Sequence, residues 1–460
     1  MERLFYNLKK FKNKIALISQ NEKKYTYEEV EKESKILSSK VDSNSTIVII
    51  GSNTIECILG YIAFMKSDNL IILLDENFKI DYIKKIIKKY QPNYVFSPNK
   101  TLIKLKKYNT IFSGKDFSLI KTRYKILKKK NKINYLLLST SGTTQSPKFV
   151  RLSRKNIINN TNDIIKYLKI NSKHTTITTM PMAYSYGLSI INTHLHSGST
   201  IIINNKTIFD RRFWNFFKKY KITSFGGVPT LYENLKRLQF DKFKFKYLKY
   251  LTQAGGKIED ATLKYFGNSC KKMNIEFWTM YGQTEASPRM SYLKWRNFFL
   301  KYGSIGKPLE GTKFKIMNDK RTIINKSNIV GELIFYGKNV SLGYSNNLKD
   351  LNKGDVNKGK LFTGDLAYKD DSGHYYIVGR KNRISKIFGL RINLDDVEKH
   401  LKKKKYQIKC VQDNKFLRIL VKKNYNLGKI KEIIFNFCNI NKEYIHISKV
   451  KKITSTNYFK

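Results

Sequence analysis

The chain has 460 residues, more than one hydrophobic core usually supports, so we expect at least two domains, and its apolar fraction of 41% is enough to fold them. Lys and Arg total 89 against 35 Asp and Glu, a formal net charge of +54. No apolar run is long enough to cross a bilayer, which argues against a membrane-spanning protein.

The charge has two explanations. So basic a balance is typical of proteins that bind nucleic acid, an acidic protein or an anionic membrane. However, Lys, Asn and Ile are abundant everywhere and the lysines are spread along the chain, as an AT-rich coding sequence would produce. Because no nucleic-acid-binding motif accompanies the charge, we favour the second explanation and expect no specific nucleic acid partner. The field should still attract nucleotides and acidic carrier proteins.

The cysteines and the N-terminal segment bear on the cellular compartment. The four cysteines are far apart and form no CxxC pair, so neither a zinc site nor a disulfide framework is indicated. The first residues, MERLFYNLKKFKNK, are charged and lack the unbroken apolar core of a signal peptide. We therefore expect a cytoplasmic protein with reduced thiols.

The first predicted helix begins at a capping box, Thr26-Tyr-Glu-Glu29, and continues to about Leu37. After it, apolar runs and amphipathic segments alternate, which predicts strands joined by helices and hence a parallel sheet flanked by helices. The predicted strands are 46–50, 70–74 and 94–96, and the predicted helices are 54–65 and 80–90.

A second passage of the same kind follows residue 148. It contains predicted helices at 156–168 and ending near 272, and predicted strands at 175–179, 200–203, 247–254 and 275–280. Close turn spacing predicts a β-rich subdomain over 312–378. Beyond Gly379 the chain is rich in lysine, with a helix predicted over 395–404. We therefore predict an α/β protein with a large domain over 1–379 and a small, mobile α+β domain over 380–460.

The stretch Leu136 to Lys148, LLLSTSGTTQSPK, combines a short buried strand with a loop rich in hydroxyl groups. Hydroxyls and free backbone N–H groups at such a turn suit a phosphate chain. The loop is not a Walker P-loop, because Pro147 precedes the lysine where that motif has glycine and Phe149 follows it where the motif has Ser or Thr. Taken alone, it is equally compatible with an ordinary Ser/Thr-rich turn.

Three later stretches give the loop a context. They are Tyr281-Gly-Gln-Thr-Glu285, Thr363-Gly-Asp365, and Gly379-Arg380 followed by KNRISKIFGLRI. In this order and approximate spacing, the four stretches resemble the core motifs of the adenylate-forming (AMP-binding) superfamily, of the acyl-CoA synthetase and adenylation-domain type. The resemblance covers nearly the whole chain. It implies that ATP and Mg²⁺ are used to activate a carboxylic acid.

The resemblance also implies a role for each motif residue. Catalysis of adenylation is mostly positioning and neutralisation of phosphate charge, so it needs donors, a metal ion and cations. Glu285 would hold Mg²⁺, Thr284 would donate to the α-phosphate, and Arg380 would reach the nucleotide. The remaining ATP-binding residues that the resemblance implies are Thr140, Ser141, Gly142, Thr143, Thr144, Lys148, Gly255, Gly256, Tyr281 and Asp365.

The acid pocket matches the segment Pro181 to Gly187, in which Tyr184 stands where many acyl-CoA synthetases have an aromatic or histidine gate, with Tyr186 and Gly187 beside it. Relatives that activate amino acids have an aspartate in this region to pair with the ammonium group, but no acidic residue occurs between Asp163 and Asp210. Because an unpaired buried ammonium is costly, we expect an acid without an α-amino group.

The small domain would serve the thiol-transfer step. Members of the superfamily rotate this domain after adenylation. Asn382 stands at the hinge, where Asp or Lys is usual, and Gly389 with Arg391 match the segment that serves thioester formation. The usual C-terminal Gly-Lys is replaced by KKITSTNYFK, which leaves Lys460 as the candidate for the catalytic lysine.

The expected reaction is therefore formation of an acyl adenylate with release of pyrophosphate, followed by transfer to a thiol. Coenzyme A and the phosphopantetheine of an acidic acyl carrier protein both remain open as acceptors. The alternative is a degenerate member of the superfamily that binds nucleotide or nucleic acid without full catalysis. For the His194-Leu-His196 pair, packing is favoured over metal binding, because residues two apart on a helix face different sides.

Overall fold

The computed structural model describes residues 4–6, 8–105, 109–126, 133–139, 148–387, 390–411, 416–421, 425–438 and 440–450, apart from the side chains of 104, 382, 384–387, 390 and 391. Contacts divide them into two compact units. The larger unit takes in the residues up to 313 and residues 335–361, and the smaller unit takes in residues 314–334 and those from 362 onwards. The units cut across the predicted β-rich subdomain; the 1–379 and 380–460 division remains a prediction.

The helices of the structure agree with the sequence pattern where one was recognised. The predicted capping box is present, because the Thr26 side chain accepts from the backbone of Glu29 while the Glu29 carboxylate accepts from the backbone of Thr26. The helices are α1 (Tyr27–Ser38), α2 (Ile55–Lys66), α3 (Ile80–Tyr90), α4 (Asn99–Leu102), α5 (Arg154–Leu168), α6 (Ser185–His196), α7 (Arg211–Lys219), α8 (Pro229–Arg237), α9 (Asp260–Lys272), α10 (Leu394–Lys403) and α11 (Leu427–Cys438).

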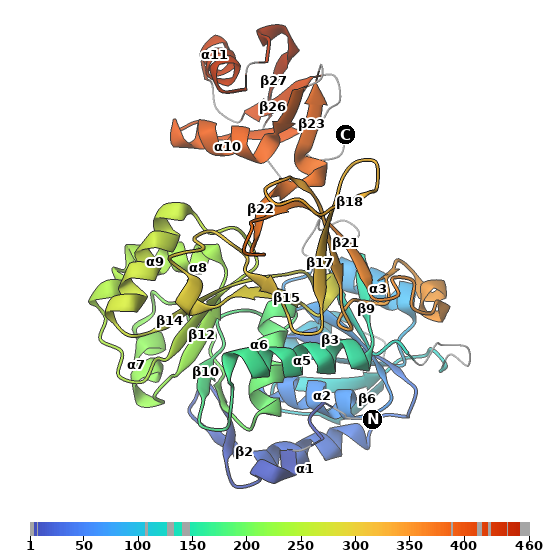
Figure 1. Ribbon diagram of the computed structural model, residues 1–460. Helices are drawn as coiled ribbons and strands as arrows, with labels where there is room; N and C mark the ends of the chain where they lie inside the picture. Colours follow the sequence, from blue (N-terminus) through green and yellow to red (C-terminus); the bar gives the residue numbers. More distant parts are fainter. Residues whose placement is uncertain are drawn as a thin grey trace. The chain divides into compact units, whose positions relative to one another are not determined.

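An eight-stranded sheet forms the first half of the larger unit (Figure 1). Its central strands β8, β4, β3 and β5 are parallel, as predicted, and antiparallel strands complete both edges. In order, the sheet contains β20 (Tyr344–Ser345), β9 (Phe149–Leu152), β8 (Leu136–Ser139), β4 (Leu70–Asp75), β3 (Thr46–Gly51), β5 (Tyr94–Pro98), β7 (Phe117–Lys121) and β6 (Asn109–Ser113).

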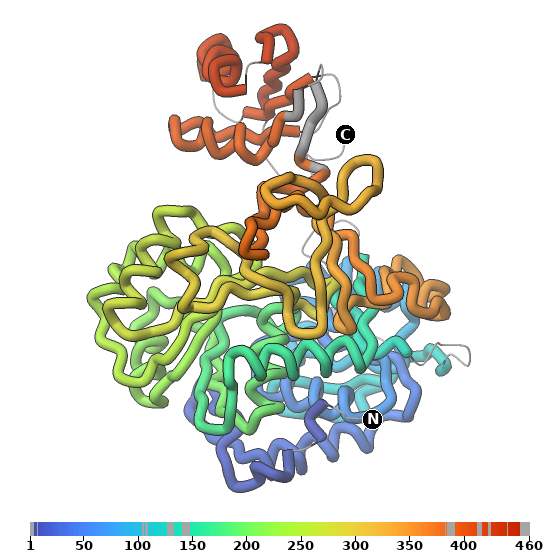
Figure 2. Tube along the Cα trace, viewed as in Figure 1, coloured from blue at the N-terminus to red at the C-terminus, as the bar shows by residue number. Residues whose placement is uncertain are grey.

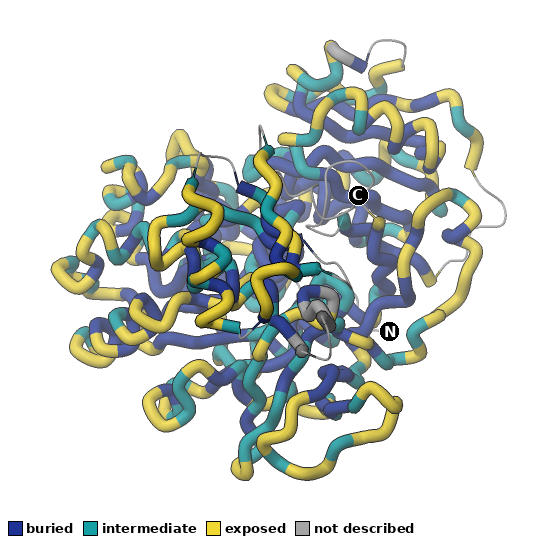
Figure 3. Tube along the Cα trace, turned by 90° about the horizontal axis from the view of Figure 1, so that it is seen from above, coloured by how far each residue is buried: buried dark blue, intermediate teal, exposed yellow. Residues whose placement is uncertain are grey.

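Both faces of this sheet are buried. Ile47 and Ile49 of β3 pack into a core shared with α1, α2 and α6, whereas Val48 and Ile50 pack into a second core with α3. Alternate residues of a strand point to opposite faces, so burial on both sides requires the unbroken apolar run TIVII that predicted the strand. Figure 3 shows buried residues along the strands and exposed residues on the surrounding helices and loops.

A nine-stranded sheet forms the second half of the larger unit, with α7, α8 and α9 packed in a core against one face. Strands β1, β11, β10, β12, β13 and β14 are parallel to their neighbours in that series. In order, the sheet contains β16 (Lys307–Pro308), β15 (Arg289–Leu293), β14 (Glu276–Gly282), β13 (Tyr250–Gln253), β12 (Ser224–Gly227), β10 (Thr175–Ile177), β11 (Thr200–Ile202), β1 (Ile15–Ile18) and β2 (Lys24–Thr26).

The smaller unit contains most of a five-stranded sheet and two small sheets. The three-stranded sheet packs with α10 and α11 around its own core, as the predicted α+β tail requires. The strands are β18 (Ile323–Ile324), β17 (Lys313–Met317), β19 (Gly331–Tyr336), β21 (Lys360–Lys369) and β22 (Tyr375–Arg380); β23 (Ile384–Ile387) and β24 (Leu390–Asn393); and β25 (Ile408–Val411), β26 (Leu417–Val421) and β27 (Ile445–Lys449).

Segments far apart in the sequence meet at the edge of the eight-stranded sheet. Strand β20 pairs antiparallel with β9, so that Tyr344 lies opposite Val150, and the path of the chain between them can be followed in Figure 2. This pairing brings Tyr344 close to Lys148 and to the start of β9. None of the helices in the described ranges is both long and apolar enough to cross a membrane.

Candidate active site

The predicted phosphate loop connects two antiparallel strands. Strand β8 ends at Ser139 and pairs with β9, which begins at Phe149. Thr140, Ser141, Gly142, Thr143 and Thr144 lie outside the described residues. Lys148 is exposed, and its Nζ lies 5.8 Å from the centroid of the Tyr344 ring. The lysine is therefore available to an anion near Tyr344.

The turn that carries Thr284 and Glu285 follows β14 directly as a single 3₁₀ turn, Thr284–Ala286. The Thr284 hydroxyl lies 3.0 Å from the Ser185 hydroxyl at the start of α6. The Tyr344 hydroxyl donates to Glu285 Oε1 at 2.8 Å. The structure thus brings Thr284 into contact with the predicted acid-pocket segment and Glu285 into contact with Tyr344.

Arg151 holds the segment that supplies Tyr344. Its guanidinium is fully buried and donates to five oxygen atoms. Nε donates to the Tyr344 carbonyl at 3.2 Å, and the terminal nitrogens donate to one amide oxygen and three further carbonyls: Asn134 (3.3 Å), Lys353 (2.6 Å), Leu342 (2.7 Å) and Gly354 (3.1 Å). Burial lowers the pKa of Arg151.

Sequence reasoning missed Arg151, Ser185 and Tyr344 as site residues. Tyr344 lies nearly sixty residues beyond Glu285, and Arg151 appeared as one basic residue among many. A fully buried arginine needs several acceptors. The sequence FVRL does not show that Arg151 is buried until β9 is known to be buried on both faces. Ser185 adjoins the recognised Tyr184, so its position was the one available signal.

Two glycines and a tyrosine form a wall beside the turn. Gly255 has φ +82°, and a Cβ on it would lie 2.5 Å from the Tyr184 hydroxyl, so both its backbone conformation and the space require glycine. A Cβ on Gly256 would lie 3.2 Å from Cγ of Pro229. Burial raises the pKa of Tyr184, which keeps its hydroxyl neutral at physiological pH. The predicted ATP and acid residues therefore meet here.

Tyr186 and Gly187 are fixed by their neighbours. The Tyr186 hydroxyl donates to the Thr252 carbonyl at 2.8 Å, and its ring is buried. A Cβ on Gly187 would lie 2.3 Å from the Pro181 carbonyl oxygen, so only glycine permits this close turn. Tyr186 is thus a rigid wall residue, whereas Tyr184, which is only partly buried, is placed to contact a ligand.

Tyr281 lies near the end of β14, opposite Ser291 of β15. It is partly buried, and its hydroxyl accepts from the Gln283 side chain at 3.3 Å. Its ring therefore has an orientation set by the strand on one side and by the following turn on the other. These contacts suit the stacking role that the superfamily resemblance implies.

In the smaller unit, Asp365 and Arg380 lie directly opposite each other on β21 and β22. Arg380 Nε forms an ion pair with Asp365 Oδ1 at 2.7 Å, with the aspartate buried and the arginine half exposed. The Asp365 backbone N–H donates to the Thr363 hydroxyl at 3.0 Å, which fixes the Thr363-Gly364-Asp365 turn. Two residues that the sequence assigned separately to the nucleotide are therefore partners.

The residues predicted for the hinge and the thiol step are less completely described. Asn382 lies in a 3₁₀ turn, Lys381–Arg383, and Arg391 lies on β24 opposite Lys386, but the side chains of Asn382 and Arg391 are not described. Gly389 and Lys460 lie outside the described residues. Next to Asn382, Lys381 Nζ pairs with Glu332 Oε2 at 2.5 Å.

The donor set fits Mg²⁺ bound together with phosphates. In the described part of the chain, no group of three or more His, Cys, Asp or Glu side chains gathers to form a complete metal site. Mg²⁺ usually binds through one or two carboxylates plus substrate phosphates and water, and the partly exposed Glu285 offers such a carboxylate. His194 is buried against its own helix, with Nδ1 2.9 Å from the Ile190 carbonyl oxygen, as packing requires.

The chain is similar in sequence to curated CoA ligases. The chain is 30% identical to the oxalate–CoA ligase of Saccharomyces cerevisiae over 250 residues, 53% of this chain and 44% of the yeast protein. It is 29% identical to 4-hydroxybutyrate–CoA ligase 1 of Metallosphaera sedula over 280 residues, 58% of this chain and 47% of that protein. The chain spans about half the length of the curated relatives it matches.

Among solved structures, the o-succinylbenzoate coenzyme A synthetase of Bacillus subtilis in complex with AMP has the same fold. The TM-score is 0.78 at 18% sequence identity, covering 99% of this chain and 96% of that one. A model of the AMP-binding enzyme family matches residues 4–345. This match includes β8, β9, the Thr284–Glu285 turn and the Tyr184 wall. The chain therefore belongs to the AMP-binding enzyme family.

Proposed function

We propose that the protein activates a carboxylic acid with ATP and transfers the acyl group to a thiol. In the first step a carboxylate oxygen attacks the α-phosphorus of ATP and pyrophosphate leaves; in the second a thiolate attacks the acyl carbon and AMP leaves. The contact between Thr284 and Ser185, at 3.0 Å, carries the proposal. It joins the turn assigned to the phosphates to the segment assigned to the acid, where the two substrates must meet.

The residues of the chain supply positioning and charge for this reaction. Lys148 and the loop Thr140 to Thr144 would hold the β- and γ-phosphates, and Thr284 would donate to the α-phosphate. Glu285 would bind Mg²⁺, which when bound neutralises phosphate charge. Tyr344 acts through Glu285, because its hydroxyl occupies one carboxylate oxygen and leaves the other for the cation.

Further residues would bind the nucleoside. Tyr281 would stack on adenine. Gly255 and Gly256, which have no side chains, would let the backbone approach the adenine closely. Asp365 would accept from the ribose hydroxyls. The ion pair with Arg380 supports this role because it orients the Asp365 carboxylate.

The acceptor thiol and the mobile domain are part of the same proposal. We propose residues 380–460 as a domain that rotates about Asn382 and serves thioester formation through Gly389 and Arg391, with Lys460 assisting the first step. The names of the two relatives, both CoA ligases, favour coenzyme A as acceptor. An acidic carrier protein is the alternative. A cytoplasmic location is supported by the four free cysteines.

ATP–pyrophosphate exchange with a panel of carboxylic acids tests the activity. We expect exchange with at least one acid lacking an α-amino group and none with amino acids, because no acidic residue between Asp163 and Asp210 is present to pair with an ammonium group. Glu285→Gln should abolish exchange, whereas Glu310→Gln, which removes an exposed partner of Lys166, should not.

A protein that only binds nucleotide would show no exchange with any acid, and a nucleic-acid binder would show a steep salt dependence of DNA binding. Lys460→Ala tests whether the C-terminal lysine takes part in adenylation, since unchanged exchange would reject that role. Thioester formation from a supplied acyl adenylate would then measure the second step alone.

A further inference from the structure

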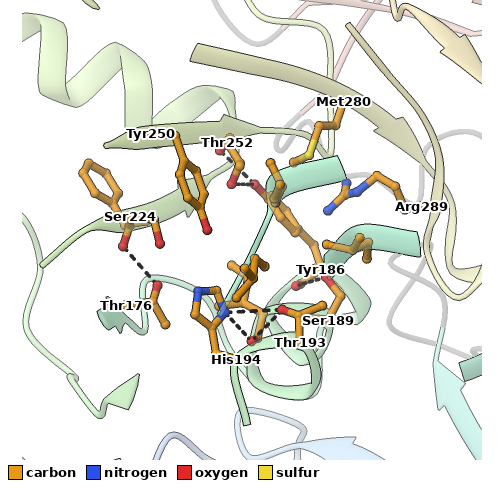
Figure 4. Close-up of a pocket in the computed structure, with 16 residues that line it drawn as sticks. Thr176, Tyr186, Ser189, Thr193, His194, Ser224, Tyr250, Thr252, Met280 and Arg289 are labelled. Atoms are coloured by element: carbon orange, nitrogen blue, oxygen red, sulfur yellow. Dashed lines mark hydrogen bonds between the residues drawn. The ribbon is translucent and has the colours of Figure 1, made fainter. Parts of the chain in front are cut away.

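A small internal cavity lies beyond Tyr186, on the side of the nine-stranded sheet (Figure 4). The space open to the centre of a water molecule is about 20 Å³, which is room for about one water. Its wall comes from α5, α6, β10, β12, β13 and β14 together with Arg289. Nothing assigned so far to ATP or Mg²⁺ lies in it.

The cavity wall contains four buried polar atoms that have no hydrogen-bond partner among the described residues: His194 Nε2, Ser224 Oγ, Tyr250 Oη and Arg289 Nε. Each of these residues is at most 4% exposed. An unsatisfied buried donor or acceptor costs roughly 1–3 kcal/mol. Four in one wall indicate that a polar group completes the cavity.

The hydrogen bonding of His194 defines what that group must supply. Nδ1 lies 2.9 Å from the Ile190 carbonyl oxygen, which can only accept, so Nδ1 carries the proton. The nearby Thr193 hydroxyl donates instead to the Ser189 carbonyl at 2.8 Å. Burial lowers the pKa of His194 to about 4, so the ring is neutral at pH 7. Nε2 is therefore an acceptor and requires a donor.

The other three atoms can donate. Ser224 lies close enough to lower the pKa of Tyr250 against the larger raising effect of burial, but the two hydroxyls do not meet hydrogen-bond geometry. The Arg289 guanidinium lies 4.8 Å from the centroid of the Tyr186 ring, and none of the described carboxylates pairs with it. The group that enters must donate to His194 and accept from donors of this set.

A hydroxyl group fits both the size and the hydrogen bonding. It has one heavy atom, donates once to His194 and accepts twice, which satisfies two of the three donors. A carboxylate has three heavy atoms, donates nothing and would place negative charge against the His194 lone pair. A methyl group fits the space but leaves every polar atom unsatisfied.

The cavity adjoins the proposed acid pocket. Tyr184 and Tyr186 are neighbours with ring centroids 6.4 Å apart, and both belong to one apolar cluster with Tyr250 and Met280. Gly226 keeps this region open, because a Cβ there would lie 2.7 Å from both the Thr252 and Tyr186 hydroxyls. An acid that passes Tyr184 would direct its far end towards the cavity.

We infer that the acid activated by this protein carries a hydroxyl group at its far end, which hydrogen-bonds to His194 and Tyr250 in the cavity beyond Tyr186. The inference rests on the proposed function. Because a hydroxyl accepts only twice, Ser224 is assigned as the second donor of the subsite. Unsubstituted alkyl acids of equal length are poor substrates because they leave the subsite unsatisfied.

The test uses straight-chain acids of four to eight carbons in three versions, ending in a methyl, a hydroxyl or a second carboxylate. Exchange with pyrophosphate measures activation, and calorimetric binding of the corresponding acyl sulfamoyl adenosines measures recognition without turnover. At the best chain length we expect the hydroxyl version to exceed the methyl version by about tenfold or more in kcat/KM and in affinity. Tyr250→Phe should reduce this ratio, and His194→Leu should reduce it further.

Tyr61→Phe is the matched control, because its buried hydroxyl donates to Asn192 outside the cavity, and it should leave the ratio unchanged. Exchange with equal preference for the methyl version would overturn the inference while leaving adenylation intact, and would mean that the cavity holds only water. A preference for the second carboxylate would also overturn it. Selective binding of the hydroxyl analogue without exchange would support the subsite and refute the activity.

Discussion

Arg151 is the buried cation on which the position of Tyr344 depends, so its replacement should disturb both folding and the site. Four of its five acceptors are backbone carbonyls of residues 342 to 354. Tyr344, in that segment, donates to Glu285. Loss of the guanidinium should therefore loosen residues 342–354 and break the hydrogen bond from Tyr344 to the Glu285 carboxylate.

The magnitude follows from counting donors. A lysine at position 151 has three N–H donors for five acceptors, so at least two acceptors lose their partner, which costs about 2 kcal/mol or more. Arg151→Met loses all five hydrogen bonds but also removes a buried charge, which leaves a net cost of about 3–5 kcal/mol. Even the lysine variant should lower the melting temperature by roughly 3 °C or more.

Thermal unfolding followed by fluorescence measures the loss of stability. Limited proteolysis within residues 342–354 measures the loosening of that segment. Arg212→Met is the matched control, since it removes an exposed arginine that pairs with Asp210, and it should change neither. If Arg151→Lys melts with the wild-type protein and is cleaved no faster, the buried carbonyl contacts do not stabilise the segment and the reasoning is refuted.

Three further outcomes follow from single contacts. Tyr344→Phe keeps the ring but removes the donor to Glu285, so the Mg²⁺ concentration that half-saturates exchange should rise by about fivefold, and an unchanged Mg²⁺ dependence would contradict the role. Asp365→Asn breaks the ion pair with Arg380 and should raise the KM for ATP by about tenfold, measured by exchange at varied ATP; an unaltered KM would exclude nucleotide binding by Asp365. His194 has its pKa lowered to about 4 by burial, so the unfolded chain binds more protons below pH 6.5. Its contribution to stability is full above pH 6.5 and is lost as the pH falls towards 4; His194→Gln should flatten that part of the melting curve against pH, and an equal slope would contradict a buried neutral ring.

Much of the fold could be predicted because its signals are local. The capping box at Thr26 and Glu29, the apolar run that forms β3 and the strand before the hydroxyl-rich loop each depend on neighbouring residues. The same logic failed for α7 and α8, where aromatic residues face a core that the sequence pattern did not reveal. Tertiary packing selects the helix there, and local propensity is a weak guide.

The candidate site divides in the same way. The motif around Glu285 was recognisable because its residue types are contiguous, and the pairing of Asp365 with Arg380 became visible only when β21 and β22 were placed side by side. Arg151 and Tyr344 could not be found from the sequence, because a buried cation and a distant hydroxyl acquire meaning from their acceptors.

The sequence by itself determined the family, the order of the strands and helices in the first half of the chain, and the residue types that suit phosphate and Mg²⁺. Only the tertiary structure decided that Thr284 meets Ser185, that Tyr344 holds Glu285, and that buried polar atoms without partners among the described residues line a cavity beside Tyr186. The physical reason is range. Strand and helix signals act over a few residues, whereas the satisfaction of buried polar groups depends on partners that folding brings from anywhere in the chain.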